Sequence, residues 1–233
     1  MRVHRFFLKI KIFGDTIKLI ESDVIHQMRD VFRLKKNDTV IILDNSGFEF
    51  EAIIDHLTRD EILLHVSKKI RNDYKPKTDL HLMYALTKKD TFEWVLEKCT
   101  ELGVSEFTPV IAERTEKKNF NFDRGEKIIK EAAEQSGKNL LPILNSIVNI
   151  KELCENNEKE KINTIAFHLD GEQFKANSFL SHEKLSVLIG PEGGWSDAEL
   201  ALFKEKNISI YTLGKQVLRA ETAAIAVTSL LMF

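Results

Sequence analysis

Two glycine-bearing loops near the C-terminal end hold the residues whose types and spacing point most directly to chemistry. The first loop, 190–194, carries Pro191 and Glu192 between its glycines and follows the apolar run 185–189. The second, 213–219, follows the apolar run 208–213. Glycines at a strand-to-helix turn let backbone groups approach a ligand that a Cβ would exclude. Two such turns can line one pocket, so the sequence predicts a small-molecule site; the alternative is that the glycines only close tight turns.

The composition of these loops indicates the kind of ligand. Neither loop matches the phosphate-binding pattern of a nucleoside triphosphatase or the glycine fingerprint of a dinucleotide site. The carboxylate of Glu192 would also repel a pyrophosphate. A neutral or partly cationic ligand therefore fits better. S-adenosylmethionine, with a purine, a sulfonium and an amino-acid tail, is such a ligand.

The two motifs also resemble a known family. Ile-Gly-Pro-Glu-Gly-Gly at 189–194 and Leu-Gly-x-x-Val-Leu-Arg-x-Glu-Thr-Ala at 213–223 are similar to motifs of the RsmE family of 16S rRNA uridine-N3 methyltransferases. This family belongs to the SPOUT class of knotted S-adenosylmethionine-dependent enzymes. The resemblance continues through 97–104 and 131–138 and through N-terminal segments 2–7 and 26–34. It therefore covers the whole chain.

The resemblance implies both a fold and an activity. The implied fold is α/β: a SPOUT-like, trefoil-knotted, parallel-sheet methyltransferase domain at 73–233 preceded by a small PUA-like RNA-binding β-barrel at 1–72. The implied activity is S-adenosylmethionine-dependent methylation of N3 of a specific uridine in the 16S rRNA of the small ribosomal subunit, by a homodimer whose pocket lies near the subunit interface. Two alternatives stay open: methylation of another RNA position, such as a ribose 2′-OH, and a non-catalytic RNA-binding ribosome-assembly factor.

The resemblance also implies roles for individual residues. Arg219 precedes a helix N-terminus, where the dipole disfavours a cation, so we expect an anionic partner. Its guanidinium could stabilise charge on the uracil oxygens as N3 loses its proton, or form an ion pair with Glu221 or Glu192. Glu221 is the candidate general base. The cofactor contacts are assigned to Leu169, Gly190, Glu192, Gly193, Gly194, Leu213, Gly214, Leu218, Thr222 and Ala223. Trp195 could shield the site or anchor the packing.

Basic residues predict where RNA binds. The densest set is N-terminal, with phenylalanines 6 and 7 interleaved, one of them expected in the core and the other free to stack on a base. On one helix, Arg29 and Arg33 would lie four residues apart on one face. Lys138 stands where the family has an arginine, so it offers a point charge rather than a planar fork. The candidate RNA-binding residues are Arg2, Arg5, Arg29, Arg33, Arg114 and Lys138.

Composition agrees with an ordinary globular protein. The 233 residues are 43% hydrophobic and 30% charged, with a net charge of −2. Residues 1–78 hold 15 Lys and Arg against 12 Asp and Glu, so a mildly basic module precedes a more acidic one. No signal peptide or membrane span is expected, and Cys99 and Cys154 read as buried thiols rather than a disulfide or metal site. We expect a cytoplasmic protein without a metal.

Periodicity and turn signals predict the elements. Strands are expected at 2–13, 39–43, 48–54 and 62–66, with a short helix at 22–33 capped by Ser22 or Asp23. A polar linker is expected at 71–78. Beyond it, strands at 80–86, 107–112, 164–169, 185–189 and 208–213 alternate with helices at 91–102, 123–136, 196–206 and 220–233. This alternation favours a parallel sheet. The last helix is apolar nearly all round, which predicts burial on every side.

Overall fold

The computed structural model describes residues 3–71, 78–179 and 182–233. The chain forms two compact units. The first holds the described residues up to 71 together with 133–141, and the second holds 78–132 and the described residues from 142 onwards. The expected boundary between residues 72 and 73, most of the expected linker and Arg2 lie outside the described residues. Residues 133–141, expected with the second domain, pack instead with the first unit.

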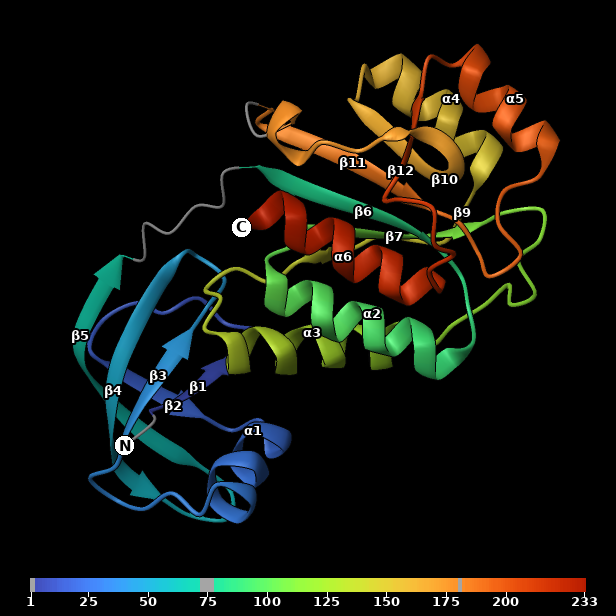
Figure 1. The fold of residues 1–233 in the computed structure, drawn as a ribbon. Coiled ribbons are helices and arrows are strands. Elements are labelled where there is room, and N and C mark those ends of the chain that lie inside the picture. The colour runs from blue at the N-terminus through green and yellow to red at the C-terminus, as the bar shows by residue number, and fades with distance from the viewer. Residues whose placement is uncertain (1–2, 72–77, 180–181) are drawn as a thin grey trace. The chain divides into compact units, whose positions relative to one another are not determined.

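The first unit is built on a mixed sheet of five strands in its described part, shown in blue and teal in Figure 1. The strands are β1 (His4–Phe7), β2 (Thr16–Leu19), β3 (Thr39–Leu43), β4 (Phe48–Leu57) and β5 (Ile62–Arg71), in the order β1-β3-β4-β5-β2. β1 and β3 are parallel, and the other neighbours are antiparallel. Alternating side chains such as Ile42 and Ile54 fill one core. The expected strand at 2–13 is therefore much shorter, and β2 was not expected.

The helix of the first unit differs from its prediction. α1 (Ser22–His26) continues directly into a π-helical turn, Gln27–Val31. The N-cap residue is Glu21, without a side-chain capping bond, so the predicted cap at Ser22 or Asp23 is wrong. The helix ends before Arg33, which adopts a left-handed φ of 54°. Arg29 and Arg33 therefore do not share a helix face, because the helical turns stop between them.

The second unit is a parallel sheet with helices on both faces (Figure 1). In its described part, seven strands pair in parallel: β6 (Asp79–Ala85), β7 (Glu106–Ile111), β8 (Ile143–Leu144), β9 (Val148–Asn149), β10 (Thr164–Gln173), β11 (Lys184–Ile189) and β12 (Ser209–Thr212). Their order is β12-β10-β11-β6-β7-β8, and β9 also pairs with β7. The predicted α/β class is confirmed.

Two hydrophobic clusters attach the helices to this sheet. On one face, α2 (Lys89–Leu102), the N-terminal part of α3 (Phe122–Ser136) and α6 (Ala220–Met232) pack on residues such as Leu82 and Val187. On the other face, α4 (Ile150–Glu160) and α5 (Asp197–Glu205) pack around Met83 and Leu188. A short 3-10 turn, Ala176–Ser178, lies between β10 and β11. α4 was not expected, although Ile150, Leu153 and Cys154 form a buried stripe along it. Many charged residues between them made the pattern hard to recognise in the sequence.

Local signals placed several helix ends correctly. Gly103 ends α2 with a φ of 116°, a left-handed conformation that favours glycine. The capping box predicted from Ser196 and Glu199 opens α5: each side chain accepts the other residue's backbone N–H. Both cysteines are buried, and burial raises the pKa of the Cys99 thiol to about 12. The prediction of buried free thiols is confirmed.

A buried polar cluster joins three strands of the second sheet. His81 on β6 contacts the Ser186 hydroxyl on β11 through Nδ1 at 3.1 Å and the Thr108 hydroxyl on β7 through Nε2 at 2.7 Å. The carboxylate of Glu106 lies 3.9 Å from Nε2 and accepts a hydrogen bond from Asn145. Burial lowers the pKa of His81 to about 4, so the imidazole is neutral at physiological pH.

Candidate functional site

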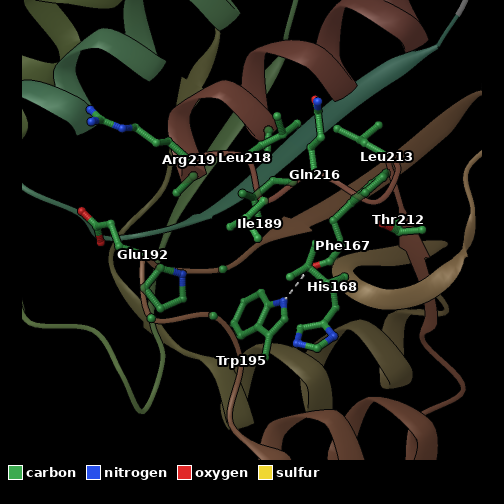
Figure 2. A pocket seen from close by; sticks show the side chains of 18 of the residues that line it. Phe167, His168, Ile189, Glu192, Trp195, Thr212, Leu213, Gln216, Leu218 and Arg219 are labelled. Carbon is green, nitrogen blue, oxygen red and sulfur yellow. Dashed lines mark hydrogen bonds between the residues drawn. The ribbon is translucent and has the colours of Figure 1, made fainter.

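A pocket of about 430 Å³ lies at the carboxyl ends of β11 and β12, beside the part of β10 where its regular pairing is interrupted. Open parallel sheets bind ligands at the carboxyl ends of their strands. Figure 2 shows its lining. The walls come from 167–169 within β10, from 189–195 at and beyond the end of β11, and from 211–214 and 216–220 at and beyond the end of β12, with Arg114 and Ala223 completing them. Its size is ordinary for a small-molecule site. The two glycine loops therefore do line one pocket, as the sequence predicted.

Close packing explains the first glycine loop. The backbone of 191–194 forms a turn in which Gly194 N–H donates to the Pro191 carbonyl oxygen over 2.8 Å. Gly194 has a φ of 67°, and a Cβ on Gly190 would lie 3.1 Å from the ring of Trp195. That distance is shorter than nearly all real Cβ contacts, so the rigid indole would have to shift by a few tenths of an ångström. The packing of Trp195 therefore favours glycine at position 190.

Trp195 anchors this loop to the neighbouring strand. Its side chain is 2% exposed, and its indole N–H donates to the carbonyl oxygen of Phe167 over 3.0 Å, the dashed line in Figure 2. Its ring meets Phe203 of α5 edge-on at 5.0 Å between centroids. Of the two roles considered for Trp195, packing anchor is the one that these contacts support, although the residue also lines the pocket.

An irregularity in β10 forms the third wall. Its pairing with β12 shifts register between Phe167 and Glu172, so the residues between them leave the regular ladder. Gly171 makes this possible, because a Cβ there would lie 2.4 Å from the backbone carbon of Tyr211. The excursion brings His168 and Leu169 into the lining.

The side chain of Thr212, the last residue of β12, holds the start of the second glycine loop. The Thr212 hydroxyl donates to the Gly214 carbonyl oxygen over 2.9 Å and accepts the Gly214 N–H over 3.2 Å. Gly214 has a φ of 147°. Beyond it, Val217 is 80% exposed at the pocket, and Arg219 forms the N-cap of α6.

Most of the expected cofactor contacts line the pocket. Those present are Leu169, Gly190, Glu192, Gly193, Gly194, Leu213, Gly214, Leu218 and Ala223. Thr222 is exposed on α6 and is not among the lining residues. The structure adds others that the sequence analysis did not single out, chiefly Phe167, His168, Tyr211, Thr212 and Gln216. Strand ends and a register shift place the first four, and Gln216 occupies an unspecified position of the second motif, so their signal in the sequence was weak.

The charged residues gather at one end of the pocket. In Figure 2, Glu192 and Arg219 lie at one end and Thr212 and His168 at the other. The Arg219 side chain is 86% exposed, and its Nη1 lies 4.0 Å from Oε1 of Glu221. Glu221 is only 20% exposed and does not itself line the pocket. The guanidinium is thus loosely held and accessible to a ligand.

A buried hydroxyl stands close to these charges. Tyr84, at the end of β6, is 2% exposed, and its hydroxyl lies 3.5 Å from that of Thr87. Burial raises the pKa of Tyr84 well above its usual value, and the charges of Glu221 and Glu192 raise it further. The phenol is therefore protonated at neutral pH and does not serve as a base.

The expected RNA-binding residues have varied surroundings. Arg114 lines the pocket and donates to the Gly193 carbonyl oxygen over 2.8 Å. Arg29 is paired with Asp30 through two hydrogen bonds of 2.7 Å, whereas Arg33 is exposed. Arg5 lies 3.9 Å from Glu49 and beside Gly137, and Lys138 is half-buried just beyond α3. Arg5 and Lys138 thus lie in the same unit, near the C-terminal end of one helix.

The described part of the chain contains no cluster of three or more histidine, cysteine or acidic side chains that could hold a metal ion. No helix in it has both the length and the apolar character needed to cross a bilayer.

The unit with the parallel sheet and the glycine-lined pocket is an RNA methyltransferase domain, because residues 74–232 match the family model of that description. A ribosomal RNA small subunit methyltransferase E of Synechocystis is 30% identical, over 91% of this chain and 71% of its own length. The protein of that name from Rickettsia conorii is 28% identical, over 97% of this chain and 93% of its own. The chain belongs to the ribosomal RNA small subunit methyltransferase E family.

Solved structures share the whole fold. A Legionella pneumophila protein in complex with bound S-adenosylmethionine superposes with a TM-score of 0.89 at 25% identity, covering 99% of this chain and 97% of that one. A ribosomal RNA small subunit methyltransferase E from Neisseria gonorrhoeae, also bound to S-adenosylmethionine, has the same fold, with a TM-score of 0.87 at 24% identity over 98% and 96% of the two chains.

Proposed function

We propose that this protein transfers a methyl group from S-adenosylmethionine to N3 of a specific uridine in the 16S rRNA of the small ribosomal subunit. The observation that carries the proposal is the pocket itself, built by both glycine loops with Glu192 and Arg219 at one end. Family membership supplies the class of reaction, and the motifs at 189–194 and 213–223 supply the N3 position through their resemblance to uridine-N3 enzymes.

The lining suits this cofactor on three counts. Backbone groups are open to a ligand at Gly190 and Gly214, where a purine edge can be read without side-chain interference. Aliphatic side chains such as Leu218 offer an apolar wall to the adenine faces. The carboxylate of Glu192 suits the positive charge of a sulfonium or an ammonium group. When bound, S-adenosylmethionine would supply an electrophilic methyl group.

Arg219 is the proposed catalytic residue. When N3 of uracil loses its proton, negative charge spreads onto O2 and O4, and an accessible guanidinium can hold either oxygen. Its exposed side chain and the long 4.0 Å distance to Glu221 leave its N–H groups available. The remaining requirement is that N3 of the uracil, the methyl carbon and the sulfonium sulfur lie in line. The fixed loops around the pocket would provide such positioning.

Glu221 is the proposed acceptor of the N3 proton. Its carboxylate stands in the first turn of α6, beside the guanidinium that would hold the uracil. A base next to the group that binds the anion can take the proton as that anion forms. Glu192, which lines the pocket directly, is the competing acceptor.

A homodimer is also part of the proposal. α6 buries Ala224, Val227 and Leu231 but leaves Leu230 49% exposed and Phe233 81% exposed. The expectation of burial on every side is thus not met within one chain, and a second copy would cover the remaining face. Sedimentation of wild type and of Leu230→Glu tests this: we expect a dimer and a monomer, respectively. A wild-type monomer would contradict it.

The cellular location follows from the proposed substrate. Because that substrate is the small ribosomal subunit, we place the enzyme in the cytoplasm.

The experiment for Arg219 separates binding from transfer. Calorimetric titration with S-adenosylmethionine and single-turnover transfer to unmodified small subunits would be measured for wild type, Arg219→Ala and Arg219→Lys. We expect cofactor affinity within about threefold of wild type, transfer slowed about 100- to 1000-fold in the alanine variant, and partial recovery in the lysine variant. Unchanged transfer by Arg219→Ala would contradict the assignment, and no cofactor binding by wild type would contradict the function.

A further inference from the structure

Among the described residues of the first unit, the most exposed aromatic side chain lies on the loop between β1 and β2, residues 8–15. Phe13 in this loop is 86% exposed. The phenylalanines considered from the sequence as base-stacking residues, Phe6 and Phe7, are 0% and 2% exposed, so neither can meet a ligand. The structure therefore places the available aromatic ring of this N-terminal segment at a different position.

Hydrogen bonds at Leu8, Lys11 and Ile12 attach the 8–15 loop to the end of β3 and to Asp44, the residue after it. Leu8 N–H donates to the Leu43 carbonyl oxygen over 2.8 Å, and Ile12 N–H donates to the Asp44 carboxylate over 3.1 Å. Lys11 donates to the Asp44 carbonyl oxygen over 2.8 Å, and the side chains of Leu8 and Ile12 are buried. Phe13 is thus presented by a fixed backbone, which lowers the entropy that binding would remove.

Cations are frequent on the segments next to Phe13. Residues 3–14 include Arg5, Lys9 and Lys11 and no acidic residue. Val66 N–H donates to the Asp15 carbonyl oxygen over 2.8 Å, so the chain two residues after Phe13 lies beside the middle of β5. That half of β5 exposes Lys68, Lys69 and Arg71. The acids near these stretches are Asp15, Asp44, whose carboxylate accepts the Ile12 N–H, and Glu51, which lies opposite Lys68. Positive charge is in excess.

We propose that Phe13 stacks on an unpaired base of the RNA substrate while Lys9 and the basic end of β5 hold the flanking phosphates. An exposed aromatic ring among cations is the arrangement by which proteins hold single-stranded nucleic acid. A single exposed apolar side chain is common on protein surfaces and alone would carry nothing. Here the fixed backbone at Phe13 and the excess of cations near it favour a nucleic acid over a protein as the partner. The inference rests on the proposed function only in taking RNA as the substrate.

The test is binding of a short, fluorescein-labelled, single-stranded RNA of mixed sequence, followed by anisotropy at fixed low salt. Phe13→Ala should weaken binding by about 5- to 100-fold, because stacking on one base is lost. Phe13→Trp should retain the affinity, and its additional indole fluorescence should be quenched by the RNA. Ile20→Ala is the matched control, since Ile20 is 68% exposed on the same unit and should leave the affinity unchanged.

The outcomes separate this inference from the proposed function. Unchanged RNA affinity in Phe13→Ala, together with no quenching in Phe13→Trp, overturns the stacking role even when wild type methylates small subunits normally. A change in sedimentation of Phe13→Ala without a change in RNA affinity also overturns it, by assigning Phe13 to a contact between copies. Weakened RNA binding with quenching supports the role, and it does so even if wild type methylates a different nucleoside.

Discussion

The indole N–H of Trp195 donates to the carbonyl oxygen of Phe167 over 3.0 Å, and both groups are buried. This bond joins the loop after β11 to the point where β10 leaves its register with β12. Two of the three pocket walls are therefore fixed relative to each other by one side chain. The shape of the pocket depends on this bond as well as on the glycines around it.

Replacing Trp195 by phenylalanine should destabilise the protein and loosen the pocket. The change removes the donor to a buried carbonyl oxygen and part of the indole volume, so we expect a loss of about 1 to 3 kcal/mol in the free energy of unfolding. Urea denaturation measures that loss, and calorimetric titration should show weaker binding of S-adenosylmethionine. Wild-type stability together with wild-type affinity would show that the bond does not shape the site.

Alanine at the two neighbouring glycines should have unequal effects. A Cβ on Gly190 would meet the rigid, buried ring of Trp195 at 3.1 Å, whereas one on Gly193 would meet the flexible side chain of Arg114 at 3.3 Å. Gly190→Ala should therefore reduce affinity for S-adenosylmethionine by roughly tenfold or more, the effect of about 1.4 kcal/mol. Gly193→Ala, the matched control, should lose several-fold less. Equal losses in the two variants would argue against this packing account.

Sequence reasoning succeeded where a signal was local. The capping box of Ser196 and Glu199, the left-handed Gly103 and the glycine loops are each defined by a few adjacent residues, and the structure has them where they were expected. The expected trefoil knot is different in kind: it stays a prediction from the resemblance, because strand and helix periodicity carries no information on threading.

Errors arose where tertiary contacts decide. Phe6 and Phe7 alternate along a strand, which predicts one exposed ring, yet both are buried because Phe7 packs with Leu43 and Ala133 in a second cluster. The register shift that brings His168 into the pocket depends on Gly171 lying against Tyr211 forty residues later. A single sequence does not reveal such a contact.

The two candidate proton acceptors should respond differently to amide substitution. Glu221→Gln should lower kcat about 100- to 10,000-fold, the usual range for loss of a general base, with little change in cofactor binding. Glu192→Gln should chiefly weaken S-adenosylmethionine binding, because Glu192 lines the pocket. Steady-state kinetics with both substrates varied gives the comparison. If Glu192→Gln loses kcat and Glu221→Gln keeps it, the roles are reversed.

His81 should make the protein sensitive to mild acid. Its pKa falls from 6.5 to about 4 on folding, chiefly through burial, so the unfolded chain binds the proton more readily. Stability is therefore complete above pH 6.5 and declines as the pH falls below that value, by about 2 to 3 kcal/mol at pH 4.5. The pKa of Glu106 is lowered despite its burial, through the Asn145 hydrogen bond and the charges of His81 and Lys184, so its contribution is lost only below about pH 4.5.

Urea denaturation of wild type and His81→Gln over this pH range tests the assignment. The variant should be less stable at neutral pH, because the hydroxyls of Ser186 and Thr108 lose their hydrogen bonds to the imidazole ring. Its stability should change less between pH 6.5 and 4.5. Parallel curves for the two proteins would show that another group is responsible for the acid sensitivity.

The most direct measurement is the identity of the methylated nucleoside. Purified protein would be incubated with labelled S-adenosylmethionine and small ribosomal subunits that lack the modification, and the digested RNA would be resolved by chromatography. The account predicts label in 3-methyluridine, at one position of the 16S rRNA. Label in a ribose-methylated nucleoside, or in any base other than uracil, would contradict the central claim.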